Sequence, residues 1–190
     1  MAKQILLTGV GCVGKTTIGK IIGEVLGINF FDLGLEIEAF FGTTIERLQG
    51  RFLTMHDYRN EAAKALVHLL SRPESEECVI ALPPSGLMGG YLKALKENKG
   101  VKVVITDRPE NILERIRFYD IDSRLLEKQL TEIEKKLYLR QIKKDISYFR
   151  SSYKRADLQV DIAGLDPTQA AHKIIEAVRE AETGLTGDAQ

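Results

Sequence analysis

The sequence is poor in residues that cross-link a domain or bind metals by themselves. It has two cysteines among 190 residues, Cys12 and Cys78, and two cysteines make no disulfide framework in a domain of this size. Cys12 lies inside a glycine-rich loop, where a disulfide would lock the backbone. We therefore expect two reduced thiols and a cytoplasmic protein. The three histidines are scattered, which predicts neither a histidine metal site nor a histidine base.

An excess of charge is absent as well. Lys and Arg together number 27 and so do Asp and Glu, and zero net charge favours neither nucleic acid nor an anionic membrane. No run reaches the ~18 apolar residues of a membrane span, and the first residues lack the order of a secretory signal. Basic residues gather between Lys135 and Arg155, but Glu132 lies four residues before Lys136, as is typical of a solvated helix face. We predict no nucleic-acid partner and no membrane partner.

The chain does have a regular alternation of short apolar runs and amphipathic stretches. The runs predict strands at 3–8, 28–32, 78–82, 101–106 and 158–162. The amphipathic stretches predict helices at 15–26, 35–42, 55–70, 109–117, 125–152 and 166–181. Short strands that alternate with helices form βαβ units and a parallel sheet covered on both faces. We predict the α/β class: a three-layer α/β/α P-loop NTPase fold with a five-stranded parallel sheet, one domain over 1–182 and a disordered tail over 183–190.

The long helix predicted at 125–152 has an apolar stripe at helical spacing. Its members are Leu126, Leu130, Ile133, Leu137, Ile142, Ile146 and Phe149. We expect this stripe to face the core, although a helix of this length also suits packing on a second subunit. Both a monomer and a homodimer remain open.

The segment Gly9–Thr16 fits the phosphate-binding pattern G-x-x-x-x-G-K-[ST] at every fixed position. Its glycines let successive N–H groups point at phosphate oxygens, and the helix that follows adds its positive end. Lys15 would reach the β- and γ-phosphates, and Thr16 would offer a hydroxyl to Mg²⁺. The pattern predicts a nucleotide and Mg²⁺, with nucleotide contacts from Gly9, Gly11, Cys12, Val13, Gly14, Lys15, Thr16 and Thr17.

Asp32 ends the second predicted strand, at the sheet edge where ligands of parallel sheets bind. There its carboxylate would hold a Mg²⁺-bound water or lie near the acceptor hydroxyl. The alternative is an N-cap for the helix that begins near Leu35. We predict Thr16 and Asp32 as metal-binding residues, and Asp32 also as a catalytic and substrate-binding residue.

Several motifs narrow the class of nucleotide-binding protein. A GTPase needs a base-reading N-K-x-D, which is absent. The stretch "FFDLGLEIEAFFGTTIERL" (30–48) resembles the shikimate kinase family, which has D-x-D-x-x-I-E followed by G-x-[ST]-I. The residues in register are Asp32, Ile37, Glu38, Gly42, Thr44 and Ile45. The resemblance covers residues 3–181 and implies an ATP-dependent kinase that phosphorylates a hydroxyl of a small metabolite.

The resemblance also implies roles for four arginines. "YRNEA" resembles the family's F-R-x-x-E, which implies that Arg59 binds the acceptor, and Arg150 falls near the second substrate arginine. Arg117 and Arg124 match the spacing of the adenine-stacking arginine and the lid arginine, which implies a lid over about 117–126. Lys15 and the lid arginine would together neutralise charge in the transition state.

Two departures from the family pattern fall on the acceptor pocket. The second aspartate of D-x-D, which hydrogen-bonds the substrate in the family, is Gly34 here, and the Gly-Gly-Gly turn is Pro83-Pro84-Ser85. Two prolines remove two N–H donors and fix φ, and a site that loses donors and acceptors leaves polar groups of the substrate unpaired. We assign Gly34 and Ser85 to the acceptor pocket and expect these departures to disfavour shikimate itself.

Three functions therefore follow from the sequence. The first is a small-metabolite kinase with Lys15, Asp32 and Arg124 as catalytic residues. The second is a regulator that binds nucleotide without turnover, because the acceptor pocket has diverged. The third is a nucleoside or nucleotide monophosphate kinase, although the expected D-G-x-P-R strand end reads "LPPSG".

Overall fold

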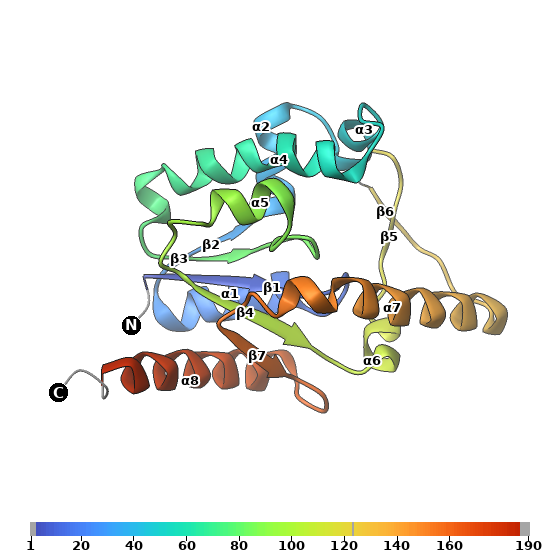
Figure 1. Ribbon diagram of the computed structural model, residues 1–190. Coiled ribbons are helices and arrows are strands. Elements are labelled where there is room, and N and C mark those ends of the chain that lie inside the picture. Colours follow the sequence, from blue (N-terminus) through green and yellow to red (C-terminus); the bar gives the residue numbers. More distant parts are fainter. Residues whose placement is uncertain (1–2, 123, 187–190) are drawn as a thin grey trace.

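A five-stranded parallel sheet forms the centre of the molecule, in the strand order β2-β3-β1-β4-β7 (Figure 1). The computed structural model describes residues 3–122 and 124–186, without the side chains of 184–186. The strands are β1 (Gln4–Thr8), β2 (Asn29–Asp32), β3 (Cys78–Ala81), β4 (Val101–Thr106) and β7 (Leu158–Asp161), and neighbours pair in parallel. The predicted sheet is confirmed, and its strands lie where the apolar runs placed them.

Helices cover both faces of this sheet, so the predicted three-layer arrangement is confirmed (Figure 1). They are α1 (Lys15–Leu26), α2 (Leu33–Phe41), α3 (Ile45–Gln49), α4 (Met55–Leu70), α5 (Gly89–Ala94), α6 (Pro109–Glu114), α7 (Glu132–Tyr153) and α8 (Pro167–Thr186). A 3₁₀ turn, η1 (Pro73–Ser75), precedes β3, and a small antiparallel hairpin is made by β5 (Phe118–Tyr119) and β6 (Leu125–Leu126). No described helix is both long and apolar enough to span a membrane.

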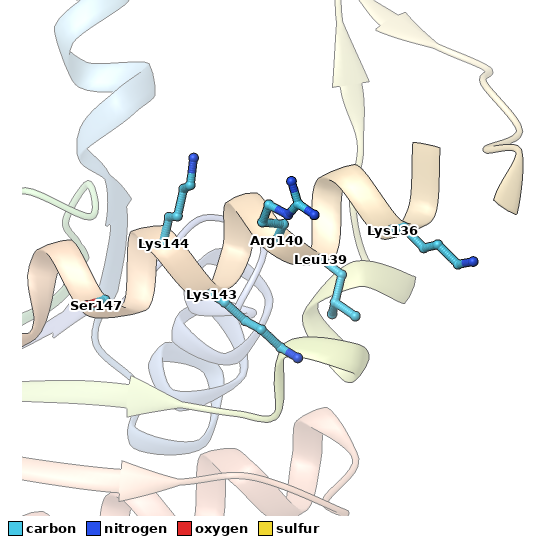
Figure 2. Close-up of a pocket in the computed structure, with 6 residues that line it drawn as sticks. All are labelled: Lys136, Leu139, Arg140, Lys143, Lys144 and Ser147. Atoms are coloured by element: carbon cyan, nitrogen blue, oxygen red, sulfur yellow. The ribbon is translucent and has the colours of Figure 1, made fainter. Parts of the chain in front are cut away.

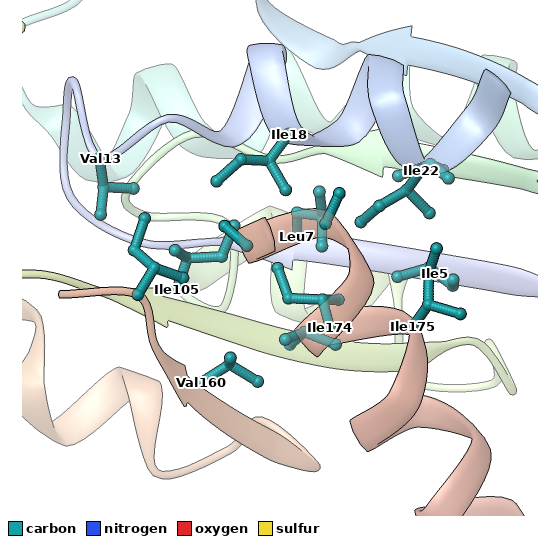
Figure 3. Packing of buried hydrophobic residues seen from close by; sticks show 14 of the residues in the cluster. Ile5, Leu7, Val13, Ile18, Ile22, Ile105, Val160, Ile174 and Ile175 are labelled. Carbon is teal, nitrogen blue, oxygen red and sulfur yellow. The ribbon is translucent and has the colours of Figure 1, made fainter. Parts of the chain in front are cut away.

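Alternate residues of β1 enter two separate cores. Ile5 and Leu7 pack with Ile18 of α1 and Ile174 of α8 in the core that Figure 3 shows. Leu6 points to the other face and joins a second core built largely from α4, with residues of α2 and β3. Side chains of a strand alternate between faces, and the inner residues of β1, Ile5 to Leu7, are all apolar, so both faces of this strand must be covered. The two cores anchor β1, and with it the loop that follows.

α7 begins at Glu132, so the predicted helix start at Leu125 is wrong. Leu125 and Leu126 instead form β6, which pairs with β5. The start of α7 is a capping box: the Thr131 hydroxyl accepts the Glu134 N–H, and the Glu134 carboxylate accepts the Thr131 N–H. The helix start was predicted too early because leucines continue at helical spacing on the N-terminal side of Glu132.

The apolar stripe predicted on this helix is core only in its second half. Ile142 is buried, and Ile146 and Phe149 pack against the first core. In the first half, Ile133 and Leu137 are 74% and 57% exposed. The reason is visible in Figure 1, where the first turns of α7 extend past the ends of the strands.

Other boundaries differ for local reasons. α2 starts at Leu33 because the Asp32 carboxylate accepts the Gly34 N–H and caps it. The sequence patterns missed the short helices α3 and α5 altogether, and α6 ends at Glu114 instead of near 117. α8 continues to Thr186, so the predicted tail boundary at 183 is wrong; residues 187–190 lie outside the described residues.

Candidate active site

The loop between β1 and α1 has the backbone geometry that its glycines allow. Gly9 has φ +146°, and a Cβ there would lie 2.6 Å from the Ile105 carbonyl oxygen of β4, so only glycine fits. Gly14 has φ +110° and directly precedes α1. Cys12, with φ +58°, is the only non-glycine residue with positive φ in the described chain. A tight loop that leads into a helix N-terminus presents N–H groups to an anion.

The Lys15 side chain folds back over this loop. Its Nζ donates to the carbonyl oxygens of Gly9, at 2.9 Å, and Val10, at 2.8 Å. Burial of the amine lowers the pKa of Lys15 to about 8, and nearby Asp32 and Cys12 partly oppose this shift. The ammonium is thus held by acceptors of its own loop, at the position from which it would reach a phosphate.

Thr16 and Asp32 lie in direct contact across the edge of the sheet. Thr16 Oγ1 donates to Asp32 Oδ2 at 2.6 Å, while Asp32 Oδ1 accepts the Gly34 N–H at 2.9 Å. Asp32 therefore caps α2, as one interpretation predicted, and also contacts the phosphate loop, while its role toward Mg²⁺ or an acceptor remains a prediction. One carboxylate and one hydroxyl, completed by phosphate oxygens and waters, make a donor set that suits Mg²⁺. Within the described residues, no group of three or more His, Cys, Asp or Glu converges.

Arg59 lies on α4 and is buried, with 9% of its surface exposed. Its Nε has no hydrogen-bond partner among the described residues, and its Nη2 lies 3.5 Å from the Tyr148 hydroxyl of α7. No ion pair neutralises this guanidinium within the described part of the chain. A buried charge without a counter-ion is costly, so an anionic group beside Arg59 would be strongly favoured.

The positions that depart from the family pattern, Gly34 and Pro83-Pro84-Ser85, lie after the carboxyl ends of β2 and β3. A Cβ added at Gly34 would lie 3.1 Å from Asp32 Oδ1, so any side chain there would crowd the carboxylate. The Pro83 carbonyl accepts from the Thr8 hydroxyl at 3.4 Å, which places the Pro-Pro turn beside the end of β1. The Ser85 carbonyl accepts the Met88 N–H in the turn that precedes α5.

The two lid arginines are exposed at either end of the β5–β6 hairpin. The Arg124 N–H donates to the Asp120 carboxylate, and the Asp120 N–H donates to the Arg124 carbonyl, each at 2.9 Å. Arg117 precedes β5 and is also exposed. The hairpin falls within the range expected for the lid, and both arginine roles remain predictions.

Arg115 is a residue that the sequence patterns missed. Its Nη1 is 3.8 Å from where a Cβ on Gly14 would lie, so its guanidinium borders the phosphate loop. Arg115 Nη2 pairs with the buried Asp107 carboxylate, and its Nε donates to the Asn111 carbonyl at 3.0 Å. Arg115, two residues before Arg117, therefore borders the loop. Spacing within the sequence does not distinguish the two.

Tyr148 is the second missed residue. Its hydroxyl, on α7, contacts Arg59, although both Tyr148 and Arg150 are exposed. Two positions along a helix correspond to a rotation of about 200°, so Arg150 lies on a different face. The structure does not bring Arg150 to Arg59, and its substrate role remains a prediction.

The basic residues of α7 surround a shallow hollow of about 450 Å³ (Figure 2). Lys144 and Arg140 point to one side of the helix, and Lys136 and Lys143 point to the other. Because the four cations diverge, they do not form a shared anion site. Lys143 also faces Glu110 of α6 at 3.8 Å. We interpret this surface as a solvated helix face.

The chain is similar to known proteins along most of its length. The family model described as shikimate kinase matches residues 11–179. A shikimate kinase of Caldicellulosiruptor saccharolyticus is 30% identical over 175 residues, 91% of this chain and 94% of that protein. The solved shikimate kinase from Aquifex aeolicus has a TM-score of 0.70 at 25% identity and covers 95% of this chain and 99% of its own. Shikimate kinase from Acinetobacter baumannii in complex with shikimate has a TM-score of 0.65 at 23% identity. The match covers 98% of this chain and 95% of that chain.

Proposed function

Since the chain belongs to the shikimate kinase family and is an ATP-dependent kinase, we propose that it phosphorylates a hydroxyl of a small hydroxylated metabolite with the residues described above. The observation that carries the proposed site is the 2.6 Å contact between Thr16 and Asp32. It brings a phosphate-loop hydroxyl and a strand-end carboxylate together at the edge where parallel sheets bind ligands.

The donor half of the site would be the loop Gly9–Thr17. Its N–H groups would bind the phosphates of ATP, and the Lys15 ammonium would exchange the carbonyls of Gly9 and Val10 for β- and γ-phosphate oxygens. Thr16 directly and Asp32 through water would hold Mg²⁺, which when bound neutralises phosphate charge. Phosphoryl transfer depends mainly on positioning and electrostatics, with little covalent chemistry for the protein.

The acceptor half would lie between α2, α4 and the end of β3. The buried guanidinium of Arg59 would pair with an anionic group of the acceptor. Asp32 would accept the proton of the reacting hydroxyl, since its carboxylate already accepts a hydrogen bond from the Thr16 hydroxyl. Gly34 and Ser85 would line the remaining pocket.

Charge on the transferred group would be neutralised from two sides. Lys15 would act from the loop and Arg124 from the lid, with Arg117 against the base of ATP. The hairpin β5–β6 supports this proposal because it extends from α6, beside the loop, toward α3 (Figure 1).

Shikimate is the first acceptor to test, because relatives that match nearly the whole chain are named shikimate kinases. We propose that another hydroxylated carboxylic acid is preferred. Gly34 brings no carboxylate to the pocket, and any side chain there would crowd Asp32. Pro83 and Pro84 add no N–H donors. A lost donor or acceptor in a site built for polar groups reduces kcat/KM by orders of magnitude.

The test is ADP release from ATP and Mg²⁺ with shikimate and with a panel of hydroxylated carboxylic acids, followed by mass spectrometry of the product. We expect acceptor-dependent turnover that Lys15→Ala reduces at least about 100-fold, as for loss of a group that stabilises transition-state charge. Lys20→Ala, an exposed lysine of α1, is the matched control. Undiminished turnover by Lys15→Ala would contradict the site. ATP binding without product from any acceptor would support the nucleotide-binding regulator instead.

A further inference from the structure

The tip of the β5–β6 hairpin is docked on the segment that follows α2. The Thr44 hydroxyl donates to the Ile121 carbonyl at 2.8 Å, and Arg47 Nη2 pairs with Asp122 Oδ1 at 2.7 Å. Figure 1 shows the hairpin extending from α6 and α7 up to α3. These contacts join residues more than 70 positions apart in the sequence.

Hydrogen bonds of Asp120 hold the turn at the tip of the hairpin together. The Asp120 carboxylate accepts the N–H groups of Asp122 and Arg124, each at 2.9 Å. The Asp120 N–H donates to the Arg124 carbonyl, so the two sides of the turn are tied together. Anchoring Ile121 and Asp122 therefore also sets the backbone position of Arg124.

The other side of the contact is joined to the acceptor side of the site. The Thr44 hydroxyl caps α3 by accepting the Arg47 N–H, and the Ile45 N–H donates to the Glu38 carboxylate of α2 at 3.0 Å. α2 in turn begins at Asp32, which caps it. A short, hydrogen-bonded path thus runs from Asp32 through α2 and α3 to the lid.

We propose that Thr44 and Arg47 are positioning residues for phosphoryl transfer. They hold the lid against the α2–α3 segment, so that Arg124 is presented over the nucleotide when that segment is in place. The inference rests on the proposed function, since Arg124 acts only if the site transfers a phosphoryl group. One exposed ion pair and one hydrogen bond of ordinary strength change such an equilibrium by roughly three- to thirty-fold.

The experiment is a charge exchange between the lid and α3. Arg47→Glu and Asp122→Lys are each expected to lower kcat about ten-fold, while the Kd of a non-hydrolysable ATP analogue changes less than about three-fold because the phosphate loop is intact. The double variant Arg47→Glu/Asp122→Lys is expected to recover kcat to within about three-fold of wild type. Arg51→Glu, an exposed arginine just after α3, is the matched control.

Thr44 is tested with a conservative pair. Thr44→Ser keeps the hydroxyl and is expected to keep kcat, whereas Thr44→Val loses both the cap and the lid contact. Single variants with wild-type kcat, or a double variant that stays as impaired as the singles while folded, would overturn the proposal.

Amide hydrogen exchange of peptides from β5 and β6, with the ATP analogue bound, separates this proposal from the function on which it rests. Arg47→Glu is expected to speed exchange there, and the double variant to slow it again. If wild type turns over no acceptor, the proposed function fails, and unchanged exchange in Arg47→Glu would then refute the docking contact by itself.

Discussion

At the scale of single residues, the polar side chains of the phosphate loop already have hydrogen-bond partners within the protein. Lys15 donates to two carbonyls of the loop, and Thr16 donates to Asp32. Each of these groups would have to exchange its partner when ATP and Mg²⁺ bind. The loop is therefore preorganised in backbone, while its side chains are held by interactions that a nucleotide would replace.

The lowered pKa of Lys15 predicts a pH dependence for nucleotide capture. Burial lowers this pKa to about 8, so the free enzyme loses the ammonium charge as the pH rises through that value. A neutral amine attracts phosphate weakly, and we expect kcat/KM for ATP to be level below pH about 7 and to fall toward ten-fold per pH unit above about 8. The measurement is kcat/KM for ATP between pH 6 and about 9.5.

Cys12→Ala is the matched control for this profile. It removes the neighbouring thiol and leaves Lys15 in place, so a decline of the same slope is expected, beginning at the same or a slightly lower pH because Cys12 helps to raise the pKa of Lys15. A profile that stays flat to pH about 9.5 in wild type would show that Lys15 is not the titrating group.

At the scale of elements, the position of Arg59 depends on how closely α5 approaches α4. A Cβ added at Gly90 would lie 2.7 Å from the Asn60 Cα and 2.8 Å from the Arg59 carbonyl oxygen. Both are backbone atoms of a helix, which cannot yield as a side-chain end can. Gly90 therefore allows the contact that holds this part of α4 in place.

Gly90→Ala is expected to lower the free energy of unfolding by about 1–3 kcal/mol, the usual cost of overpacking. Urea unfolding measures it. Gly50→Ala is the control, because Gly50 has φ −61° and an added Cβ would meet nothing closer than 3.5 Å; we expect a change within about 0.5 kcal/mol. A Gly90→Ala protein as stable as wild type would mean that α4 and α5 do not pack this closely.

At the scale of the whole molecule, the strand order brings the site together. β1 is central, with β3 and β4 beside it and β2 beyond β3. Asp32 is in register with Ala81, and Ala81 with Leu7, so the ends of β1, β2 and β3 meet at one edge. Thr16 and Asp32, far apart in the chain, meet there because parallel strands align their carboxyl ends.

Nucleotide binding at this edge is expected to stabilise the entire domain. A non-hydrolysable ATP analogue with Mg²⁺ at about 100 times its Kd adds about 2.7 kcal/mol, which raises Tm by about 5–10 °C for a chain of this length. Differential scanning calorimetry with and without a chelator measures the share due to Mg²⁺. Lys15→Ala should lose most of the shift and Lys20→Ala should keep it. An equal shift in both variants would place the nucleotide elsewhere.

The sequence by itself determined the features that depend on neighbouring residues. The phosphate loop, the five strands and the parallel sheet follow from glycines, apolar runs and their spacing, because backbone freedom and strand periodicity are set over a few residues. The family resemblance carried by Asp32–Ile45 likewise follows from short motifs, and the family match confirms it.

Only the tertiary structure decided which of several similar residues reach the site. Arg115, which the motif spacing did not indicate, borders the loop, and Tyr148 of α7 contacts Arg59. Leu125 and Leu126 continue a helical spacing but form a hairpin strand, since their partners on β5 offer pairing that no local pattern records. Such outcomes depend on which face of an element meets another element, and a shift of one or two residues along a helix changes that face by 100° or about 200°.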